Sequence, residues 1–471
     1  MDRASIRVRL ATSAAYFLLL GGSTIGFIAH DTLSTTGSVA IAIGAFGGFA
    51  LLFAPSLRPH SLTLRRVVLA SALLIAVAVI TPPRGSHDIW SYTMYGRILS
   101  AHHSSPFTSV PANFPRDPLL HLVSRGWRHT GSVYGPGFIA LAGSATAITG
   151  RSVLASRLFF QGLDAAALIA ALTLVWRRTR DPAAVAVLGL NPAVLAVVNG
   201  GHNDLLVGLA LLAGTLLVLD DRPRSAGVVL AFGALVKLVV LLPIGALLVW
   251  AWRRNGASRT VPAAASLGLV VVGGYALAGG GAALGPLLHA RTHRSRSGVW
   301  QLPTQWLVDT FGVNRSGLTH AIGTVAPLLV LLIATVVVIG ALRNRAESPP
   351  RLETLAAVVA GAAGLAFLLG ASYVLPWYST WTLPLVALAW RSRVAVVTAI
   401  QAAVLAVAYI APVVTAGSLL AVYVQDVVPI VCVVALWYLV VSARRGRLTE
   451  PIRAATAPSE RGSPDQLVAR W

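Results

Sequence analysis

The chain has 471 residues, of which 56% are hydrophobic and only 11% are charged, and its mean hydropathy is +0.74. Soluble domains carry about 25% charged residues, so this composition excludes an ordinary soluble protein. Apolar runs of about 20 residues recur along most of the chain, which is typical of proteins whose helices cross a membrane several times.

The net charge of +21 comes almost entirely from arginine, since Lys237 is the only lysine. Most arginines lie in short segments between apolar runs, where basic residues orient a membrane protein and contact anionic lipid. We therefore expect the lipid bilayer, and no nucleic acid, as the partner of these charges. Cys432 is the only cysteine, which excludes an intrachain disulfide.

The apolar runs predict an all-α polytopic membrane protein with about 12 to 15 transmembrane helices. The runs fall near 10–30, 36–54, 66–82, 134–149, 158–176, 182–199, 203–220, 225–251, 260–280, 320–342, 354–375, 376–391, 393–414 and 417–441. They divide the chain into N-terminal membrane helices (1–82), a long loop (83–133), a helical bundle (134–442) with an outer loop (281–319), and a disordered cytoplasmic tail (443–471).

The arginine clusters predict that the N-terminus lies in the cytoplasm and that the loop at 83–133 lies outside a plasma membrane. One cluster conflicts with this count: Arg177, Arg178 and Arg180 should be cytoplasmic, yet simple counting places them outside. Either the run at 134–149 does not cross fully, or the run at 225–251 consists of two short helices that meet at Lys237.

The segment from Arg84 to Pro136 is long, polar and rich in aromatic residues, which indicates a functional loop rather than a connector. Asp88, Tyr92 and Tyr95 recur at helical spacing and would share one face of an interfacial helix. Asp88 is therefore the best catalytic candidate, and the alternative is that Ser86 or Asp88 only caps the helix. Apolar neighbours would dip into the membrane boundary, namely Ile89, Trp90, Met94, Ile98 and Leu99.

Polar residues inside apolar regions provide further candidates, because such residues are expensive at membrane depth. His202, with adjacent glycine amides, suits phosphate binding, and Asp204 suits metal ligation; the alternative is a turn in which Asn203 or Asp204 caps a helix. Lys237 could hold a phosphate as a point charge or extend to the interface.

Two outer segments are ambiguous on sequence alone. Trp377, Tyr378 and Trp381 fit either an aromatic belt or a lipid- or sugar-binding pocket. The basic segment from His289 to Arg296 could contact a phosphate donor or an anionic acceptor. No P-loop or dinucleotide-binding fingerprint is present, so a nucleotide-sugar donor is not expected.

Taken together, these segments resemble the GT-C glycosyltransferases, particularly the actinobacterial enzymes that build lipomannan and mannolipids of the cell envelope from polyprenyl-phosphate-mannose. The resemblance rests on motifs in the family's order: His87 to Arg97, Ser105 to Thr108, Asp117-Pro118, Ser132 to Pro136, Asn191-Pro192, Gly201 to Asp204, Val236-Lys237 and Pro376 to Tyr378. The chain departs from the family pattern at His102 to Ser105, where an Asn is expected.

This resemblance implies an inverting mannosyltransferase that makes an α-mannosidic bond to a mannan or glycolipid acceptor on the extracytoplasmic side. It implies Asp88 as the catalytic residue and leads us to expect that cations bind the donor phosphate, namely Lys237, Arg97 and His202. We expect substrate contacts from His87, Tyr92, Tyr95, Tyr134, Asn203, Asp204, Trp377 and Tyr378. No metal ligand is predicted, although a divalent metal is left open. The alternatives are another polyprenyl-phosphate sugar donor, such as arabinofuranose or glucose, and a lipid-linked sugar transporter or flippase.

Overall fold

The computed structural model describes residues 3–29, 32–290, 293–343, 350–410 and 417–452, and these residues are almost entirely helical. One isolated β-bridge, between Ser392 and Pro451, is the only β pairing among them. The all-α fold class predicted from the sequence is thus confirmed.

The first half of the chain forms α1 (Arg3–Ile28), α2 (Thr35–Leu52), α3 (Arg58–Ser61), α4 (Leu64–Ile80), α5 (Asp88–Ser100), η1 (Pro111–Asn113), η2 (Leu120–Leu122), η3 (Arg125–Trp127), α6 (Pro136–Thr149), α7 (Val153–Thr179), α8 (Pro182–Gly189), α9 (Pro192–Gly200), α10 (Asp204–Leu219) and α11 (Pro223–Val236). The second half forms η4 (Leu238–Val240), α12 (Leu241–Asn255), α13 (Ala257–Leu277), α14 (Gly281–Ala290), α15 (Gln301–Phe311), α16 (Arg315–Leu342), α17 (Leu352–Gly370), η5 (Pro376–Trp381), α18 (Leu383–Val386), η6 (Ala387–Ala389), α19 (Arg393–Ala408), α20 (Leu419–Val422), the π-helical turn η7 (Tyr423–Val427) and α21 (Val428–Arg444).

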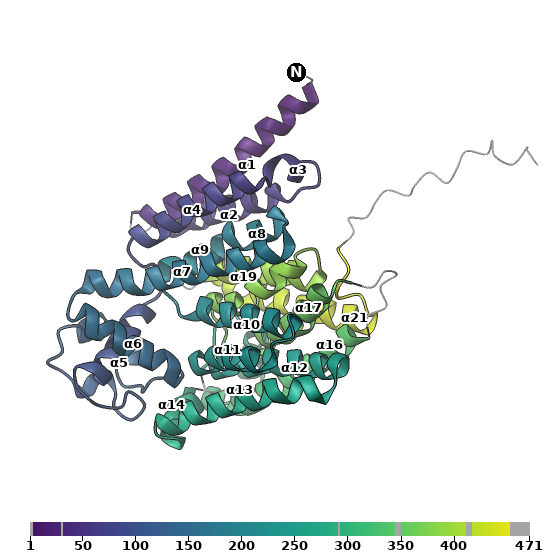
Figure 1. Ribbon diagram of the computed structural model, residues 1–471. Helices are drawn as coiled ribbons and strands as arrows, with labels where there is room; N and C mark the ends of the chain where they lie inside the picture. Colours follow the sequence, from purple (N-terminus) through teal and green to yellow (C-terminus); the bar gives the residue numbers. More distant parts are fainter. Residues whose placement is uncertain (1–2, 30–31, 291–292, 344–349, 411–416, 453–471) are drawn as a thin grey trace, which may run out of the picture.

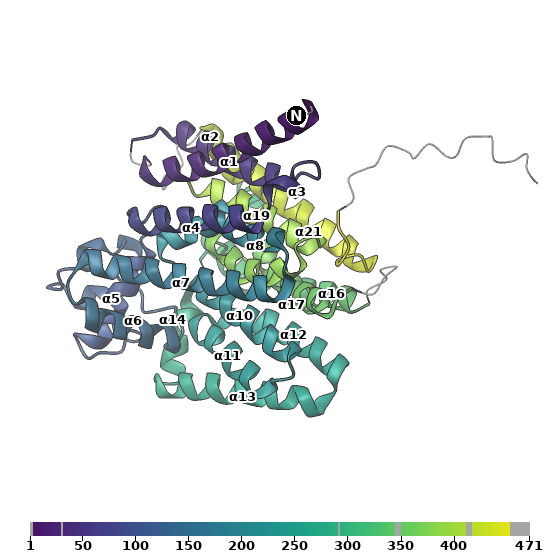
Figure 2. The same ribbon diagram turned by 45° about the horizontal axis from the view of Figure 1, so that its top comes forward.

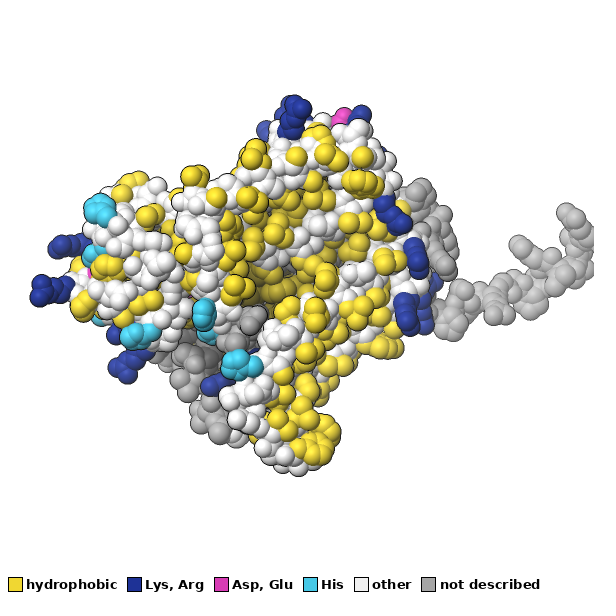
Figure 3. Space-filling model, turned by 90° about the horizontal axis from the view of Figure 1, so that it is seen from below, with side chains coloured by type: hydrophobic (Ala, Val, Ile, Leu, Met, Phe, Trp, Pro, Cys, Tyr) yellow, Lys and Arg dark blue, Asp and Glu magenta, His cyan; other side chains and the backbone are white. Residues whose placement is uncertain are grey.

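The helices stack in layers, as Figures 1 and 2 show. Helices α1, α2 and α4 form one outer layer, α13 lies on the opposite side, and α10 and α17 lie between them. Helices α5 and α6 project at one end of the stack. The middle of the molecular surface in Figure 3 is covered by hydrophobic side chains, and most basic side chains lie at its edges. This distribution matches a protein that passes through a bilayer.

Among the described residues, eight helices are long and apolar enough to cross a membrane, or nine if the bent pair α8 and α9 is one span. Four further apolar helices are shorter: α6, α10, α11 and α19. The chain is therefore a multi-pass membrane protein, and the predicted 12 to 15 crossings depend on these short helices.

Three of the predicted runs are broken in the structure, and one of them, 182–199, forms the bent pair α8 and α9. The run at 225–251 is two helices, as the sequence suggested, because Lys237 adopts an extended backbone between α11 and η4. The run at 376–391 was expected to be a single span, and this expectation is wrong. It forms the three short elements η5, α18 and η6, whose prolines Pro376 and Pro384 cannot continue a regular helix.

Helix α6 has 14 residues and reaches only about 21 Å, against about 30 Å for a bilayer core, which agrees with the alternative that the run at 134–149 does not cross fully. Asp181, which follows these arginines, accepts a hydrogen bond from Trp390 Nε1 at 2.9 Å. The guanidinium groups of Arg58 and Arg391 lie over the same Trp390 ring. Clusters that were all predicted to be cytoplasmic therefore lie together at one end of the molecule.

The start of the predicted C-terminal tail is ordered rather than disordered. Helix α21 continues to Arg444, and the backbone N–H of Arg393 donates to the Glu450 carbonyl at 3.1 Å. The Arg393 guanidinium also pairs with the Glu450 carboxylate at 3.4 Å. The rest of the predicted tail, residues 453–471, lies outside the described residues.

Helix α5 is more deeply buried than the predicted interfacial helix. Ile89, Met94 and Ile98 are fully buried inside the protein, so they do not dip into the membrane boundary as expected. Helix α6 covers this face, and Gly96 makes the close approach possible, because a Cβ atom there would lie 2.3 Å from the carbonyl oxygen of Ala142. The first turn of α5 is thereby held against the bundle.

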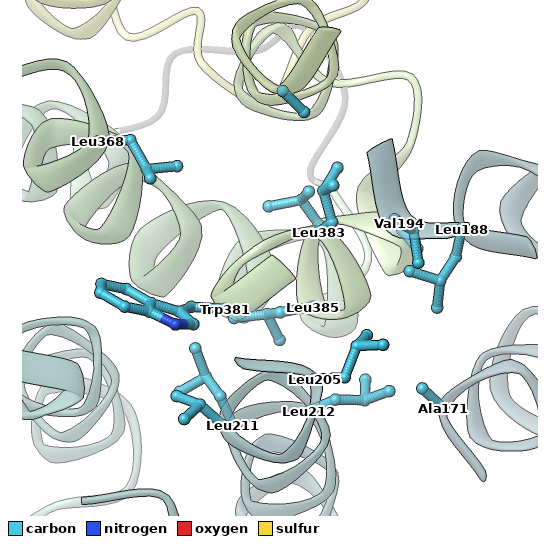
Figure 4. Close-up of a cluster of buried hydrophobic side chains, with 14 of the residues drawn as sticks. Ala171, Leu188, Val194, Leu205, Leu211, Leu212, Leu368, Trp381, Leu383 and Leu385 are labelled. Carbon is cyan, nitrogen blue, oxygen red and sulfur yellow. The ribbon is translucent and has the colours of Figure 1, made fainter. Parts of the chain in front are cut away.

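The core beneath the broken segments is tightly packed and apolar. Figure 4 shows Trp381 of η5 close to Leu211 of α10, with Leu385 and Leu368 on neighbouring elements. Each of these four side chains is at most 3% exposed. The irregular segments are therefore supported by a continuous core.

We expect Gly96→Ala to lower the stability of the protein, because the added methyl group would collide with the α6 backbone. Overpacking of this kind costs about 1–3 kcal/mol. The measurement is the thermal unfolding midpoint in detergent. The matched control is Gly162→Ala on α7, where a Cβ meets nothing within 4 Å; equal midpoints for the two variants would contradict the close packing of α5.

Candidate active site

A cavity of about 1040 Å³ opens beside the first turn of α5. Its wall combines residues from the long loop, the break at Lys237, the η5 segment and helix α16. Predicted site residues that line it are His87, Asp88, Tyr134, Lys237, Trp377 and Tyr378. Segments that are up to about 340 residues apart in the chain thus meet around one space, since Gly85 and Val424 both line it.

Asp88 is the first residue of α5, and its side chain is 17% exposed to the cavity. Its Oδ2 atom lies 3.3 Å from Nδ1 of His202. The His202 ring stacks on Trp377, with ring centroids 4.0 Å apart and planes 17° apart. Ser86 Oγ accepts the Asp88 backbone N–H at 3.1 Å, so the Asp88 carboxylate is not needed as a cap for the helix.

The electrostatic surroundings keep Asp88 ionised. Burial raises its pKa, but the adjacent His202 and the positive charge of Lys237 more than offset this effect. The net pKa of Asp88 therefore lies below the ordinary value of 3.8. A carboxylate in this state can accept a hydrogen bond or a proton from a ligand at neutral pH.

Lys237 is held by a carboxylate and three aromatic rings. Its Nζ atom lies 2.6 Å from Asp204 Oδ1, and the Asp204 side chain is fully buried. The ammonium group also lies over the rings of Tyr378, Trp381 and Tyr134, at 4.8, 5.5 and 5.6 Å from the centroids. This environment fixes the direction of the ammonium group, and its remaining N–H donors can face a ligand.

The backbone break explains why Lys237 reaches this position. The backbone of Lys237 has φ −143° and ψ 113°, which is an extended conformation between two helices. Asp204 sits in the first turn of α10, where a negative charge also interacts favourably with the helix dipole. Trp381 Nε1 donates a second hydrogen bond to Asp204 Oδ1, so the ion pair is embedded in polar contacts.

The predicted tyrosines form an aromatic wall behind Asp88. Tyr92 is fully buried and meets Tyr134 edge-to-face, with ring centroids 4.9 Å apart. Tyr95 is also fully buried, and its hydroxyl donates to the Thr130 carbonyl at 2.9 Å. Of these three, only Tyr134 lines the cavity. Tyr92 and Tyr95 therefore support the wall rather than face the space.

Asn203 is 2% exposed, and neither its side-chain oxygen nor its nitrogen has a hydrogen-bond partner among the described residues. The side chain does not cap α10, although the sequence offered that alternative. His87 lies at the cavity edge, where its Nδ1 atom is 3.3 Å from the carbonyl oxygen of Leu122. His87 therefore borders the cavity, whereas Asn203 does not line it.

Six predicted site residues do not line the cavity: Tyr92, Tyr95, His202, Asn203, Asp204 and Arg97. His202 and Asp204 contact the lining residues Asp88 and Lys237, whereas Arg97 is bound elsewhere. The Nε and Nη2 atoms of Arg97 contact Asp117 Oδ2 at 2.9 and 2.8 Å, and its Nη1 donates to the Gly150 carbonyl at 2.8 Å. His102 Nε2 joins the same carboxylate at 2.8 Å. These contacts tie the end of α5 to the long loop, so the Arg97 side chain stabilises the loop and does not face the cavity.

Several cavity residues were not among the predicted site residues. Trp127 comes from the long loop, Tyr409 follows α19, and Tyr373 precedes the aromatic residues Trp377, Tyr378 and Trp381, which the sequence had indicated. The aromatic richness of the loop and of the YVLPWYSTW segment was the available signal for Trp127 and Tyr373. Nothing in the sequence around Tyr409 distinguishes it from an interfacial tyrosine.

A buried amide clamp holds the entry to the long loop. Gln161 Nε2 donates to the carbonyls of Thr81 and Asn199 at 3.0 and 2.7 Å. Asn199 Nδ2 in turn donates to the Pro82 carbonyl at 3.0 Å. The clamp fixes the chain six residues before Asp88.

Among the described residues, no three His, Cys, Asp or Glu side chains form a group that could hold a metal ion.

We expect Arg97→Gln to destabilise the protein by about 3–5 kcal/mol, because it leaves the buried Asp117 carboxylate without its main partner. The free energy of unfolding in detergent, from denaturant titration, measures the effect. Arg125→Gln, at an exposed arginine of the same loop, is the matched control and should be nearly neutral. A stable Arg97→Gln protein would show that this ion pair does not hold the loop.

Residues 11–254 match the family model described as "Alpha-(1->6)-mannopyranosyltransferase, N-terminal domain". The chain is 28% identical over 241 residues to alpha-(1->6)-mannopyranosyltransferase A of Mycobacterium tuberculosis, covering 49% of this chain and 44% of that protein. It is 26% identical over 181 residues to the protein of the same name from Corynebacterium glutamicum, covering 36% of each. The aligned part thus spans less than half the length of these curated relatives. No solved structure gives a significant match.

The matched region includes three of the central residues of the candidate site, namely Asp88, His202 and Lys237. It covers just over half of the chain, and the structure around it is that of a multi-pass helical membrane protein. The chain therefore belongs to the alpha-(1->6)-mannopyranosyltransferase family of mannosyltransferases.

Proposed function

We propose that this chain transfers mannose from polyprenyl-phosphate-mannose to a hydroxyl group of a mannan or glycolipid acceptor, with inversion, on the extracytoplasmic side of the membrane. The observation that carries the proposal is the shared cavity, in which an ionised carboxylate, Asp88, and a buried ammonium group, Lys237, face the same space. Membership of the family supports mannose as the transferred sugar. The apolar lining of the cavity supports a lipid-linked donor.

The apolar wall of the cavity suits a polyprenyl chain. Helix α16 contributes Pro327, Val330 and Leu331 to this wall, and α12 contributes Leu242. The Leu331 side chain is also 55% exposed on the apolar surface of the molecule. A lipid tail could therefore pass from the bilayer into the cavity without leaving an apolar environment.

In the proposed reaction, Asp88 accepts the proton of the acceptor hydroxyl as its oxygen bonds to the anomeric carbon of mannose. The bond between that carbon and the phosphate oxygen breaks, and the polyprenyl phosphate leaves with the electron pair. Phosphate is a good leaving group, so a single base suffices. One displacement inverts the anomeric centre, so a β-linked donor gives an α-mannoside.

Lys237 and His202 are the proposed partners of the departing phosphate, whose negative charge grows as the bond breaks. The Asp204 carboxylate positions Lys237 for this role. The unpartnered Asn203 amide is a further candidate for a hydrogen bond to the donor. Arg97 is not part of this proposal, because its guanidinium group is occupied by Asp117 and Gly150.

The aromatic residues Trp377 and Tyr378 are proposed to bind the sugar or the first isoprene units, since both are apolar surfaces on the cavity wall.

The proposed location of the reaction rests on the positive-inside rule. Figure 1 shows α5, which begins at Asp88, and α6 at one end of the molecule, and α3 and α21, which include Arg58 and Arg444, toward the other end. The end that carries α5 and α6 is the proposed extracytoplasmic end.

We expect Asp88→Asn to reduce mannose transfer by at least about a hundredfold, as for loss of a general base. The assay uses purified protein, labelled polyprenyl-phosphate-mannose and a synthetic mannoside acceptor, with products analysed by mass. Asp309→Asn, at an exposed carboxylate of α15, is the control and should remain active. Activity that survives in the Asp88 variant would move the base elsewhere, with Asp204 as the next residue to test.

We also expect the acid limb of kcat/KM to lie below about pH 4, because the pKa of Asp88 is lowered from its ordinary value. The active form is the ionised carboxylate, which persists above the lowered pKa and is lost only as the pH falls through it. The pH profile of kcat/KM with a neutral acceptor measures this limb. An acid limb at pH 5 to 6 would indicate that Asp88 is not the group that must be ionised.

A further inference from the structure

A second hollow, of about 490 Å³, adjoins the active-site cavity. The two spaces share the segment Arg294 to Arg296 as a common wall. The outer part of the second space is formed by α15, the first residue of α16 and the π-helical turn η7. Its lining residues are Arg294, Ser295, Arg296, Gln301, Gln305, Arg315 and Gln425.

The lining is strongly polar and carries three positive charges and no negative one. Among the described residues, no carboxylate lies within ion-pairing distance of Arg294, Arg296 or Arg315. The nearest acidic residues along the chain, Asp309 and Asp426, are not part of the lining. Burial and the charge of Arg315 lower the pKa of Arg294, and both residues line this hollow.

The basic wall is held in place by the surrounding structure. Arg294 Nη1 donates to Thr304 Oγ1 at 2.7 Å, which orients the guanidinium group from α15. The backbone N–H of Ser295 donates to the carbonyl of Ser372 at 3.1 Å. Gln305 contributes a buried side-chain oxygen that has no hydrogen-bond partner among the described residues. The hollow therefore combines arginine N–H donors with a glutamine oxygen that can accept a hydrogen bond.

We propose that this hollow is a second anion-binding site, which takes a phosphate ester of a lipid-linked glycan. Arginine side chains bind phosphate through paired N–H groups, and three of them converge here. The neighbouring glutamine amides can hydrogen-bond to the hydroxyl groups of an attached sugar. A neutral acceptor would not require three arginines, and a cation would be repelled by them.

The position of the hollow indicates which phosphate it takes. The proposed function already places the donor phosphate beside Lys237 in the first cavity, and this inference rests on that function. A ligand that spans the shared wall would place its sugar near Asp88 and its phosphate between Arg294 and Arg315. The favoured ligand is therefore an acceptor glycolipid with a phosphodiester, and the donor phosphate is the other source of the same chemistry.

The test compares two synthetic probes that differ only in charge. Both carry the same octyl chain and dimannoside, and in one of them a phosphodiester joins the two parts. Binding to the full-length protein in neutral detergent is measured by isothermal titration calorimetry. We expect the phosphodiester probe to bind at least about tenfold more tightly than the neutral probe, as for hydrogen bonds to charged groups.

Arg315→Gln and Arg296→Gln should remove most of this tenfold preference, while binding of the neutral probe stays unchanged. Both side chains are exposed, so these variants should fold. Arg116→Gln, at an exposed arginine of the long loop, is the matched control and should keep the preference. Equal binding of the two probes to the wild type, or an unchanged preference in both variants, would overturn the proposal.

Kinetics distinguishes the two sources of phosphate. If the site takes the acceptor, Arg315→Gln raises the KM for the phosphodiester acceptor about tenfold and leaves the KM for the donor unchanged. A raised donor KM instead would assign the site to the donor phosphate. If wild-type protein transfers no mannose but still prefers the charged probe, the proposed function fails and the anion site stands. Asp88→Asn should lose transfer and retain the preference.

Discussion

A charged ammonium group inside a membrane protein is unfavourable unless it is paired, and Lys237 is paired with Asp204 over 2.6 Å. The pair joins two elements that are 33 residues apart in the chain, the break after α11 and the first turn of α10. Trp381 from η5 donates to the same carboxylate. Three segments of the chain therefore share one buried charge, and their arrangement sets the shape of the cavity.

The irregular backbone around the cavity is consistent with this constraint. A membrane tolerates non-helical segments only where they are buried in protein or line a polar space. The break at Lys237 and the short elements η5, α18 and η6 meet this condition, because the apolar residues of the central core support them. The same breaks expose backbone and side-chain groups to the cavity, which a set of straight helices would not do.

Asp88 depends on a different set of contacts, which hold the chain before and after this residue. The amide clamp of Gln161 and Asn199 fixes the chain before the loop, and Arg97 with Asp117 fixes the end of α5. Between them, the absence of a side chain at Gly96 lets α5 approach α6 closely. The result is that a loop carboxylate has a position as well defined as that of a residue in the bundle.

The sequence by itself determined the membrane class, the all-α fold and the family, because these depend on hydropathy, arginine distribution and local motifs. It also offered the break at Lys237 as one of two explanations for the position of the arginines at 177–180. Only the tertiary structure decided which polar residues meet. Lys237 and Asp204, or His202 and Trp377, come together through packing between distant helices, which no local pattern encodes. The same reason separates Arg97 from the site: its partner Asp117 lies 20 residues away in an irregular loop, whose path depends on the whole fold.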